Sequence, residues 1–134
     1  MAQFDHERLD VYRVSIAFVA LADDTIGTLP RGRAYLADQL QRAALSIPLN
    51  IAEGAGEWSP KDKKRFYRVA LRSATECAAI LDVCRHLKLA NEEQLNSGRD
   101  SLLRVVSMLT RMTKESGTGT GTQKQQESPP NKRS

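Results

Sequence analysis

The sequence predicts an all-α protein: an antiparallel up-and-down four-helix bundle with a disordered C-terminal tail. Apolar residues recur at steps of three and four in four successive segments, which is the periodicity of helices buried on one side. Strand-like alternation and internal repeats do not occur. Short connections rich in Gly, Pro or polar residues join the segments, as expected for antiparallel neighbours in a bundle. We expect the bundle domain to span residues 1–115 and the tail residues 116–134.

The first helix is predicted to begin at Glu7, after a loose leader, and to end at Gly27–Pro30 because glycine and proline interrupt helices. Two apolar rows run along this segment. The first row is Leu9, Tyr12, Ile16 and Val19, and the second row is Val11, Val14 and Phe18. A helix with two apolar rows buries more than one side. We therefore expect this helix to be tightly enclosed or to contact another subunit.

The second helix is predicted over residues 33–53, followed by a stop at Gly54-Ala55-Gly56, since glycine adopts the left-handed cap conformation readily. Its apolar row is Leu36, Leu40, Ala43, Ala44, Ile47 and Ile51. Pro48 lies inside this row and removes a backbone donor. Because the row continues in phase beyond Pro48, a kinked single helix is favoured over two segments that meet there.

Residues 50–58 gather polar side chains and glycines at the corner after the second helix. Asn50 and Glu53 are expected to hydrogen-bond backbone groups that are left free by Pro48 and by the helix end. The alternative is that this corner forms a binding edge.

The third helix has a strong start signal, because Ser59 can cap it, Pro60 occupies the first position and Asp62 the third. The fourth helix opens with a similar signal at Asn91, with Gln94 three residues on. The apolar series of the third helix is Phe66, Ala70, Ser73, Cys77, Ile80, Cys84 and Leu87. That of the fourth is Leu95, Leu102, Val106 and Leu109, with Leu103 and Met112 beside it.

The tail is polar and of low complexity from Gly117 onward, so it cannot bury a core and is expected to be disordered. No apolar run approaches the roughly 18 to 20 residues that span a bilayer. The N-terminus lacks the basic and apolar regions of a secretory signal. We therefore expect a cytoplasmic protein that does not bind a membrane.

Motifs for catalysis or metal binding are missing. The only histidines are His6 and His86, and no paired C-x-x-C, H-x-x-H or E-x-x-H pattern occurs. Cys77 and Cys84 lie about 10.5 Å apart along one helix, which is too far for a disulfide, and are expected to be small core residues. The sequence therefore predicts a protein that is not an enzyme and holds neither a metal nor a cofactor.

A row of cations is the most distinctive charge feature in a chain whose net charge is +4. At about 100° per residue, this row lies on the side of the third helix away from Phe66. It consists of Lys61, Lys64, Arg65, Arg68 and Arg72, and Arg42 of the second helix is a weaker candidate. Clustered cations favour phosphate backbones, and Trp58 could stack on a base. The alternative is a solvated helix face with Trp58 packed over the end of the bundle.

Three stretches of the sequence together carry a family signature. The longest is Gln39-Leu-Gln-Arg-Ala-Ala-Leu-Ser-Ile-Pro-Leu-Asn-Ile-Ala-Glu-Gly-Ala-Gly56. The others are Leu9-Asp-Val-Tyr12 and Phe66-Tyr-Arg-Val-Ala70, the latter with Ser73 and Glu76. These stretches resemble the bacterial 23S rRNA intervening-sequence proteins. The resemblance covers about residues 7–113. Glu57 departs from the family, whose members often carry a basic residue there, so a positive charge is missing beside this corner.

The resemblance implies an antiparallel four-helix bundle that assembles as a homopentamer, with nucleic-acid binding as the usual suggestion for its function. It carries no catalytic residues. The leading hypothesis is therefore a homo-oligomer that binds RNA or DNA electrostatically. The alternative is an adaptor for a partner protein, because the accessory variability proteins of diversity-generating retroelements resemble this family and bind a reverse transcriptase.

Overall fold

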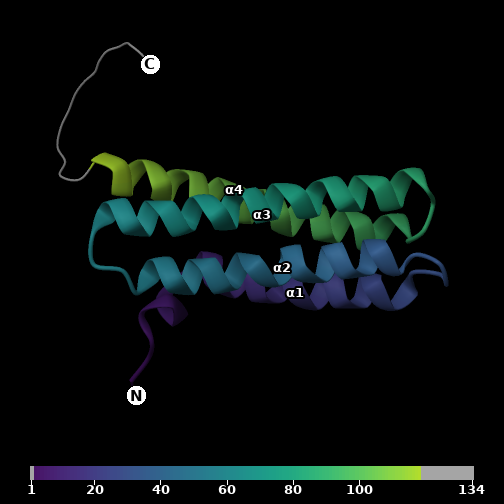
Figure 1. Cartoon of the computed structure of the whole chain (residues 1–134), viewed down its shortest axis with the longest axis horizontal. Coiled ribbons are helices and arrows are strands. Elements are labelled where there is room, and N and C mark those ends of the chain that lie inside the picture. Colours follow the sequence, from purple (N-terminus) through teal and green to yellow (C-terminus); the bar gives the residue numbers. More distant parts are fainter. Residues whose placement is uncertain (1, 119–134) are drawn as a thin grey trace, which may run out of the picture.

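Four long helices form one bundle in the computed structural model, which describes residues 2–118 (Figure 1). A short 3-10 helix, η1, precedes them at Asp5–Arg8. The four helices are α1 (Asp10–Thr28), α2 (Ala34–Ala55), α3 (Pro60–His86) and α4 (Glu92–Thr118). Each of them packs on two neighbours: α1 and α3 both contact α2 and α4. The predicted all-α bundle is confirmed, and none of the described residues forms a strand.

The ends of the helices lie close to the predicted positions, with two differences. Asp5–Arg8 forms a separate helical turn, so α1 begins at Asp10 and not at Glu7. α4 continues to Thr118, three residues into the predicted tail. The rest of that tail, residues 119–134, lies outside the described residues.

The core side of α1 differs from the row that the sequence suggested first. The buried residues are Val11, Ser15, Phe18, Ala22 and Thr25, whereas Ile16 of the first row is 45% exposed. Ser15 and Thr25 can be buried because their hydroxyls donate to the carbonyls of Tyr12 and Leu21, and a paired polar group costs little in a core. The second predicted row therefore supplies Val11 and Phe18 to the core.

α2 runs through Pro48 as one helix, so two separate segments do not meet there. The end of α2 differs from the prediction in its position and in its cap. The helix extends to Ala55, and Gly56 caps it with a φ of −85°, not in the left-handed conformation. The helix end is satisfied without that conformation, because the Gly56 and Glu57 N–H groups donate to the carbonyls of Ala52 and Gly54. The Nζ atom of Lys63 also donates to the carbonyls of Gly54 (3.4 Å) and Ala55 (3.0 Å).

Both predicted N-terminal caps are confirmed. The Oγ atom of Ser59 accepts a hydrogen bond from the backbone N–H of Asp62 at 3.0 Å. The Oδ1 atom of Asn91 accepts from the N–H of Gln94 at 2.7 Å. These bonds satisfy donors that the first turn of a helix leaves free, and they fix where α3 and α4 begin.

Three positions of the predicted rows on α3 and α4 are shifted. Tyr67 is buried at 4% exposure, whereas Phe66 is only half-buried. Leu87 lies beyond the end of α3 and is 44% exposed. On α4, Val105 is fully buried and Val106 is half-buried. The other members of the two predicted rows, Ala70, Ser73, Cys77, Ile80 and Cys84 on α3 and Leu95, Leu102 and Leu109 on α4, are buried.

The end of α2 approaches the start of α3 closely at Gly54. A Cβ atom at this position would lie 2.6 Å from Cε1 and 2.8 Å from Cδ1 of Tyr67. Carbon atoms in contact normally lie about 3.5 to 4.0 Å apart. Only glycine therefore lets the buried ring of Tyr67 pack against the backbone of α2.

The substitution Gly54→Ala should lower the free energy of unfolding by about 1–3 kcal/mol, because overpacking a rigid contact outweighs the gain in helix propensity. Urea denaturation measures this change. Gly27→Ala is the matched control, since its Cβ would meet nothing within 4 Å and should leave stability unchanged or raise it by up to about 1 kcal/mol. Equal effects of the two substitutions would contradict the close approach.

Candidate nucleic-acid interface

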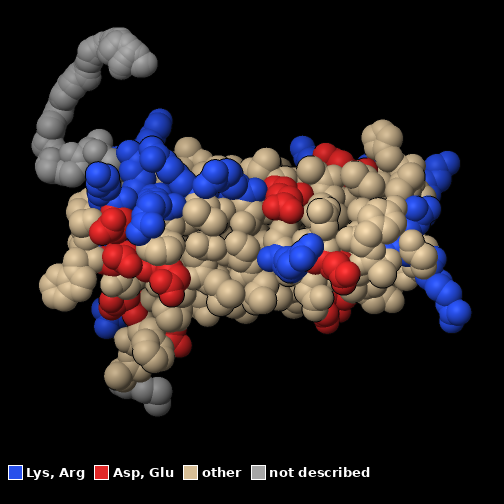
Figure 2. All heavy atoms as spheres, viewed as in Figure 1, with Lys and Arg blue, Asp and Glu red and all other residues tan. Residues whose placement is uncertain are grey.

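The predicted cations of α3 lie together on its outer side. Lys61, Arg65, Arg68 and Arg72 are exposed, and Lys64 is half-buried. Figure 2 shows Lys and Arg side chains gathered over the left part of the molecule, where Figure 1 places the first half of α3. The bond between Ser59 and the Asp62 N–H starts the helix at Pro60, so the row begins in the first turn of α3.

Carboxylates neutralise little of this row. Of its five cations, in the part of the chain that the structure describes, only Arg65 lies within 4.0 Å of a carboxylate, that of Asp62 at 3.9 Å. The Arg65 guanidinium also lies 4.8 Å from the centre of the Phe66 ring. An exposed ion pair at this distance is weak. The row therefore keeps most of its positive charge for an external anion.

Acidic side chains border the row at both ends. Glu53 and Glu57 lie near the α2–α3 corner, and Glu76 follows Arg72 by one turn of α3; Glu53 and Glu76 are exposed, and Glu57 is half-buried. Red atoms lie beside the blue cluster in Figure 2. The positive row thus forms a strip along the first half of α3.

Arg42 does not join this strip. The Oγ atom of Ser73 donates to the Oγ atom of Ser46 at 2.8 Å, and this bond fixes the level of α2 relative to α3. Arg42 is exposed one turn before Ser46 on α2. Because α2 and α3 run antiparallel, that places Arg42 beyond Arg72 and level with Glu76.

Lys63 belongs to the same run of cations but points the other way. Its ammonium caps the end of α2 through the carbonyls of Gly54 and Ala55. This structural role of Lys63 was not predicted from the sequence. Its helical angle, about 60° from Phe66 and away from the row, is the signal that could have separated it from the other lysines.

Asn50 and Glu53 do not play the predicted roles. The Nδ2 atom of Asn50 donates to the carbonyl (2.9 Å) and to the Oγ atom (3.0 Å) of Ser46, and not to the Ala44 carbonyl that Pro48 leaves free. Among the described hydrogen bonds, Glu53 makes none to the helix end, where Lys63 takes the carbonyls. Asn50, Ser46 and Ser73 instead form a polar cluster between α2 and α3.

Trp58 does not pack over the end of the bundle. Its side chain lies in the connection between α2 and α3 and is 96% exposed. The alternative in which Trp58 serves as a packing residue at the end of the bundle is therefore wrong. An indole in water, one residue before the cap of α3, is free to contact a ligand.

The two cysteine thiols are unsuited to nucleophilic chemistry. Burial, together with the nearby charge of Glu76, raises the pKa of Cys77 to about 12. Burial also raises the pKa of the Cys84 thiol and of the Tyr67 hydroxyl. Because the thiolate is the reactive form of cysteine, both thiols are protonated and unreactive at neutral pH. Residues 2–114 contain no cluster of three potential metal ligands.

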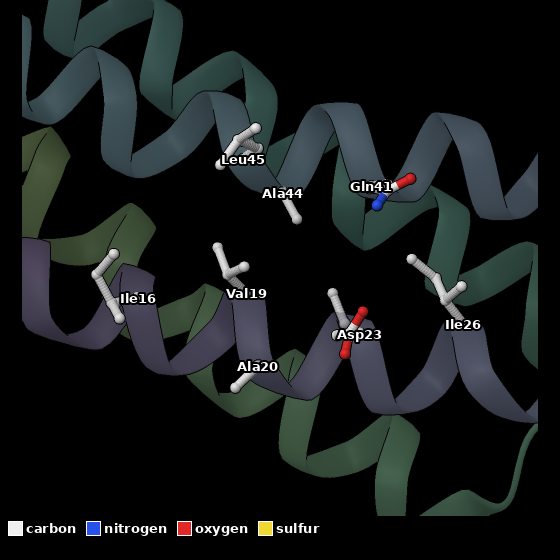
Figure 3. A pocket seen from close by; sticks show the side chains of 9 residues that line it. Ile16, Val19, Ala20, Asp23, Ile26, Gln41, Ala44 and Leu45 are labelled. Atoms are coloured by element: carbon white, nitrogen blue, oxygen red, sulfur yellow. The ribbon is translucent and has the colours of Figure 1, made fainter.

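A second surface feature is an apolar groove between α1 and α2. Figure 3 shows Val19 of α1 and Ala44 of α2 pointing toward one another across it, with Ile26 farther along α1. The cavity has a volume of about 420 Å³. Ile16 and Leu45 line one end and are 45% and 48% exposed. None of the described helices is long and apolar enough to cross a membrane.

Comparison with known proteins identifies a family and a similar solved structure. The sequence model of a family described as 23S rRNA-intervening sequence protein matches residues 7–111, more than half of the chain. A solved structure from Bacteroides thetaiotaomicron, described as a protein with unknown function from the S23 ribosomal protein family, has a similar fold. It matches with a TM-score of 0.72 and 22% identity, over 78% of this chain and 98% of that chain. No curated protein matches.

The substitution Lys63→Met should lower the free energy of unfolding by about 1 kcal/mol, because two carbonyls at the end of α2 lose a charged donor. Lys61→Met is the control: that lysine is exposed and has no carboxylate within 4.0 Å among the described residues, so its loss should change stability by less than about 0.5 kcal/mol. Thermal or urea denaturation distinguishes the two. A larger effect at Lys61 would show that Lys63 is not the cap.

Proposed function

Since this chain belongs to the family of 23S rRNA-intervening sequence proteins, we propose that it is a non-enzymatic, homo-oligomeric bundle that binds nucleic acid through α3. The observation that carries this proposal is the strip of Lys61, Lys64, Arg65, Arg68 and Arg72. Four of these five side chains are exposed, and only one lies near a carboxylate. Cations that are exposed and unpaired can bind a phosphate backbone without first breaking ion pairs with carboxylates of the same protein.

The length of the strip matches a short stretch of backbone. From Lys61 to Arg72 the helix rises about 16 Å, at about 1.5 Å per residue. One strand of a duplex carries a phosphate about every 3.4 Å, so the strip faces about five phosphates. Such contacts do not read base edges. Binding should therefore tolerate many sequences and depend strongly on salt.

The affinity for a nucleic acid of mixed sequence should fall steeply with salt. If about four cations contact phosphates, the slope of log K against log salt concentration is about −3 to −4. The triple substitution Arg65→Glu, Arg68→Glu, Arg72→Glu should weaken binding at low salt at least about tenfold and flatten this slope. Fluorescence anisotropy titrations at several salt concentrations measure both quantities.

The matched control changes Arg31, Arg99 and Arg104 to Glu, which alters the net charge equally at exposed positions away from the strip. Its effect should be much smaller. Loss of binding in both triple variants would indicate a dependence on net charge alone, and no binding by the unaltered protein at low salt would refute the proposal. Circular dichroism verifies that both variants remain helical.

The apolar groove between α1 and α2 supports the homo-oligomeric part of the proposal. Ile16, Leu45 and Leu49 are each about half exposed on these two helices, although such side chains are normally buried. Asp23 is the one charged residue that lines the groove. A second copy of the chain is the proposed occupant, as the family resemblance implies, and it would cover the apolar face of α1.

The double substitution Leu45→Glu, Leu49→Glu should shift the protein toward the monomer, because a charge buried in an apolar interface is costly. Light scattering coupled to gel filtration measures the mass at micromolar concentration. Leu103→Glu, on α4 at 55% exposure, is the control and should leave the mass unchanged. A monomeric unaltered protein would refute the oligomer.

An adaptor for a partner protein, such as a reverse transcriptase, is the second candidate function. The same groove favours it, because an apolar face between two helices accepts a helix from another protein. The two functions differ in a simple measurement: an adaptor would have little affinity for nucleic acid alone. A reverse transcriptase gene next to this gene would also favour the adaptor.

A further inference from the structure

The position of Trp58 extends the cationic strip beyond the start of α3. Trp58 precedes Ser59, whose side chain caps the helix, and Lys61 is the first cation of the strip. Three residues span at most about 11 Å even when extended, so the indole and the Lys61 ammonium can act on one ligand. The left end of Figure 1 shows this connection at the tip of the bundle.

The exposure of Trp58 has no structural explanation within the described residues. The side chain is 96% exposed, whereas large aromatic side chains normally bury most of their apolar surface. No ring or guanidinium in the described part of the chain stacks on it. Both faces of the indole are therefore available to a flat ligand.

The exposed indole of Trp58 favours a single strand over a duplex. The bases of a duplex would be stacked out of reach of Trp58, whereas those of a single strand are free to stack on an aromatic side chain.

We propose that the ligand of the α3 strip is single-stranded nucleic acid, and that Trp58 stacks on one of its bases while the cations hold the adjoining phosphates. This inference rests on the proposed function, since it names the class of nucleic acid that the same surface binds. Stacking on an aromatic side chain tolerates any base, in agreement with binding that does not select a sequence.

The protein carries its own probe for this contact, because Trp58 is its single tryptophan. The full-length chain is titrated with an oligothymidylate of about twelve nucleotides, within the range of known single-strand sites, while tryptophan fluorescence and anisotropy of the labelled oligonucleotide are both followed. Stacking should quench most of the tryptophan emission at the same concentrations at which anisotropy reports binding. Heparin and an abasic oligonucleotide of equal length should bind without this quenching.

The substitution Trp58→Ala should weaken binding to the oligothymidylate by about 5- to 150-fold, the loss expected when one stacked base is lost. Affinity for heparin and for the abasic oligonucleotide should remain unchanged. Trp58→Phe should restore part of the affinity because phenylalanine also stacks. Tyr35→Ala, an exposed aromatic residue near the start of α2, is the matched control and should have no effect.

The outcomes separate this inference from the proposed function. Binding of the oligothymidylate with unchanged tryptophan emission would overturn the stacking and leave electrostatic binding intact. An equal loss of affinity for heparin in Trp58→Ala would also overturn it. Heparin has no bases, so the indole would then support the cations of the strip and would not stack on a base. Tighter binding of a duplex of equal length would overturn the preference for single strands. Absence of binding to every polyanion would overturn the proposed function as well.

Discussion

The contact between Gly54 and the ring of Tyr67 is the constraint on which the corner between α2 and α3 depends. It lets the end of α2 lie against the start of α3, within reach of the Lys63 ammonium. That ammonium donates to the carbonyls of Gly54 and Ala55 at the end of α2, so Lys63 turns inward. The other cations at the start of α3 are left on the outer side, and Trp58, in the connection between α2 and α3, is left exposed.

Local signals predicted much of the fold. The caps at Ser59 and Asn91 depend on residues within one turn, and a sequence shows such residues directly. The core side of α1 was harder to predict because Ser15 and Thr25 break the apolar pattern while their hydroxyls bond within their own helix. The cap of α2 could not be predicted from Gly56 alone, because its partner, Lys63, comes from the next helix.

The candidate site, like the fold, has features that local patterns predict and features that depend on contacts between helices. The outward row of α3 follows from helical periodicity, which needs no knowledge of the neighbouring helices. The place of Arg42 depends on how far α2 is displaced along α3, and only the Ser46–Ser73 contact reveals it. The exposure of Trp58 depends on whether another element covers the corner, which no local pattern determines. The groove between α1 and α2 likewise requires two helices to be placed side by side.

The polar cluster of Ser46, Asn50 and Ser73 has a consequence for the uniqueness of the bundle. Small residues such as Ala43, Ala70 and Ala74 in the seam between α2 and α3 offer little shape that would oppose a slide of α3 past α2 by one turn, about 5.4 Å. Such a slide would separate the hydroxyls of Ser46 and Ser73, and Ser46 would keep its bond from Asn50 within α2, whereas Ser73 would lose its partner at a cost of about 1–3 kcal/mol. One hydroxyl pair between the helices, together with the contact of Gly54 with Tyr67, thus selects one alignment of α2 and α3.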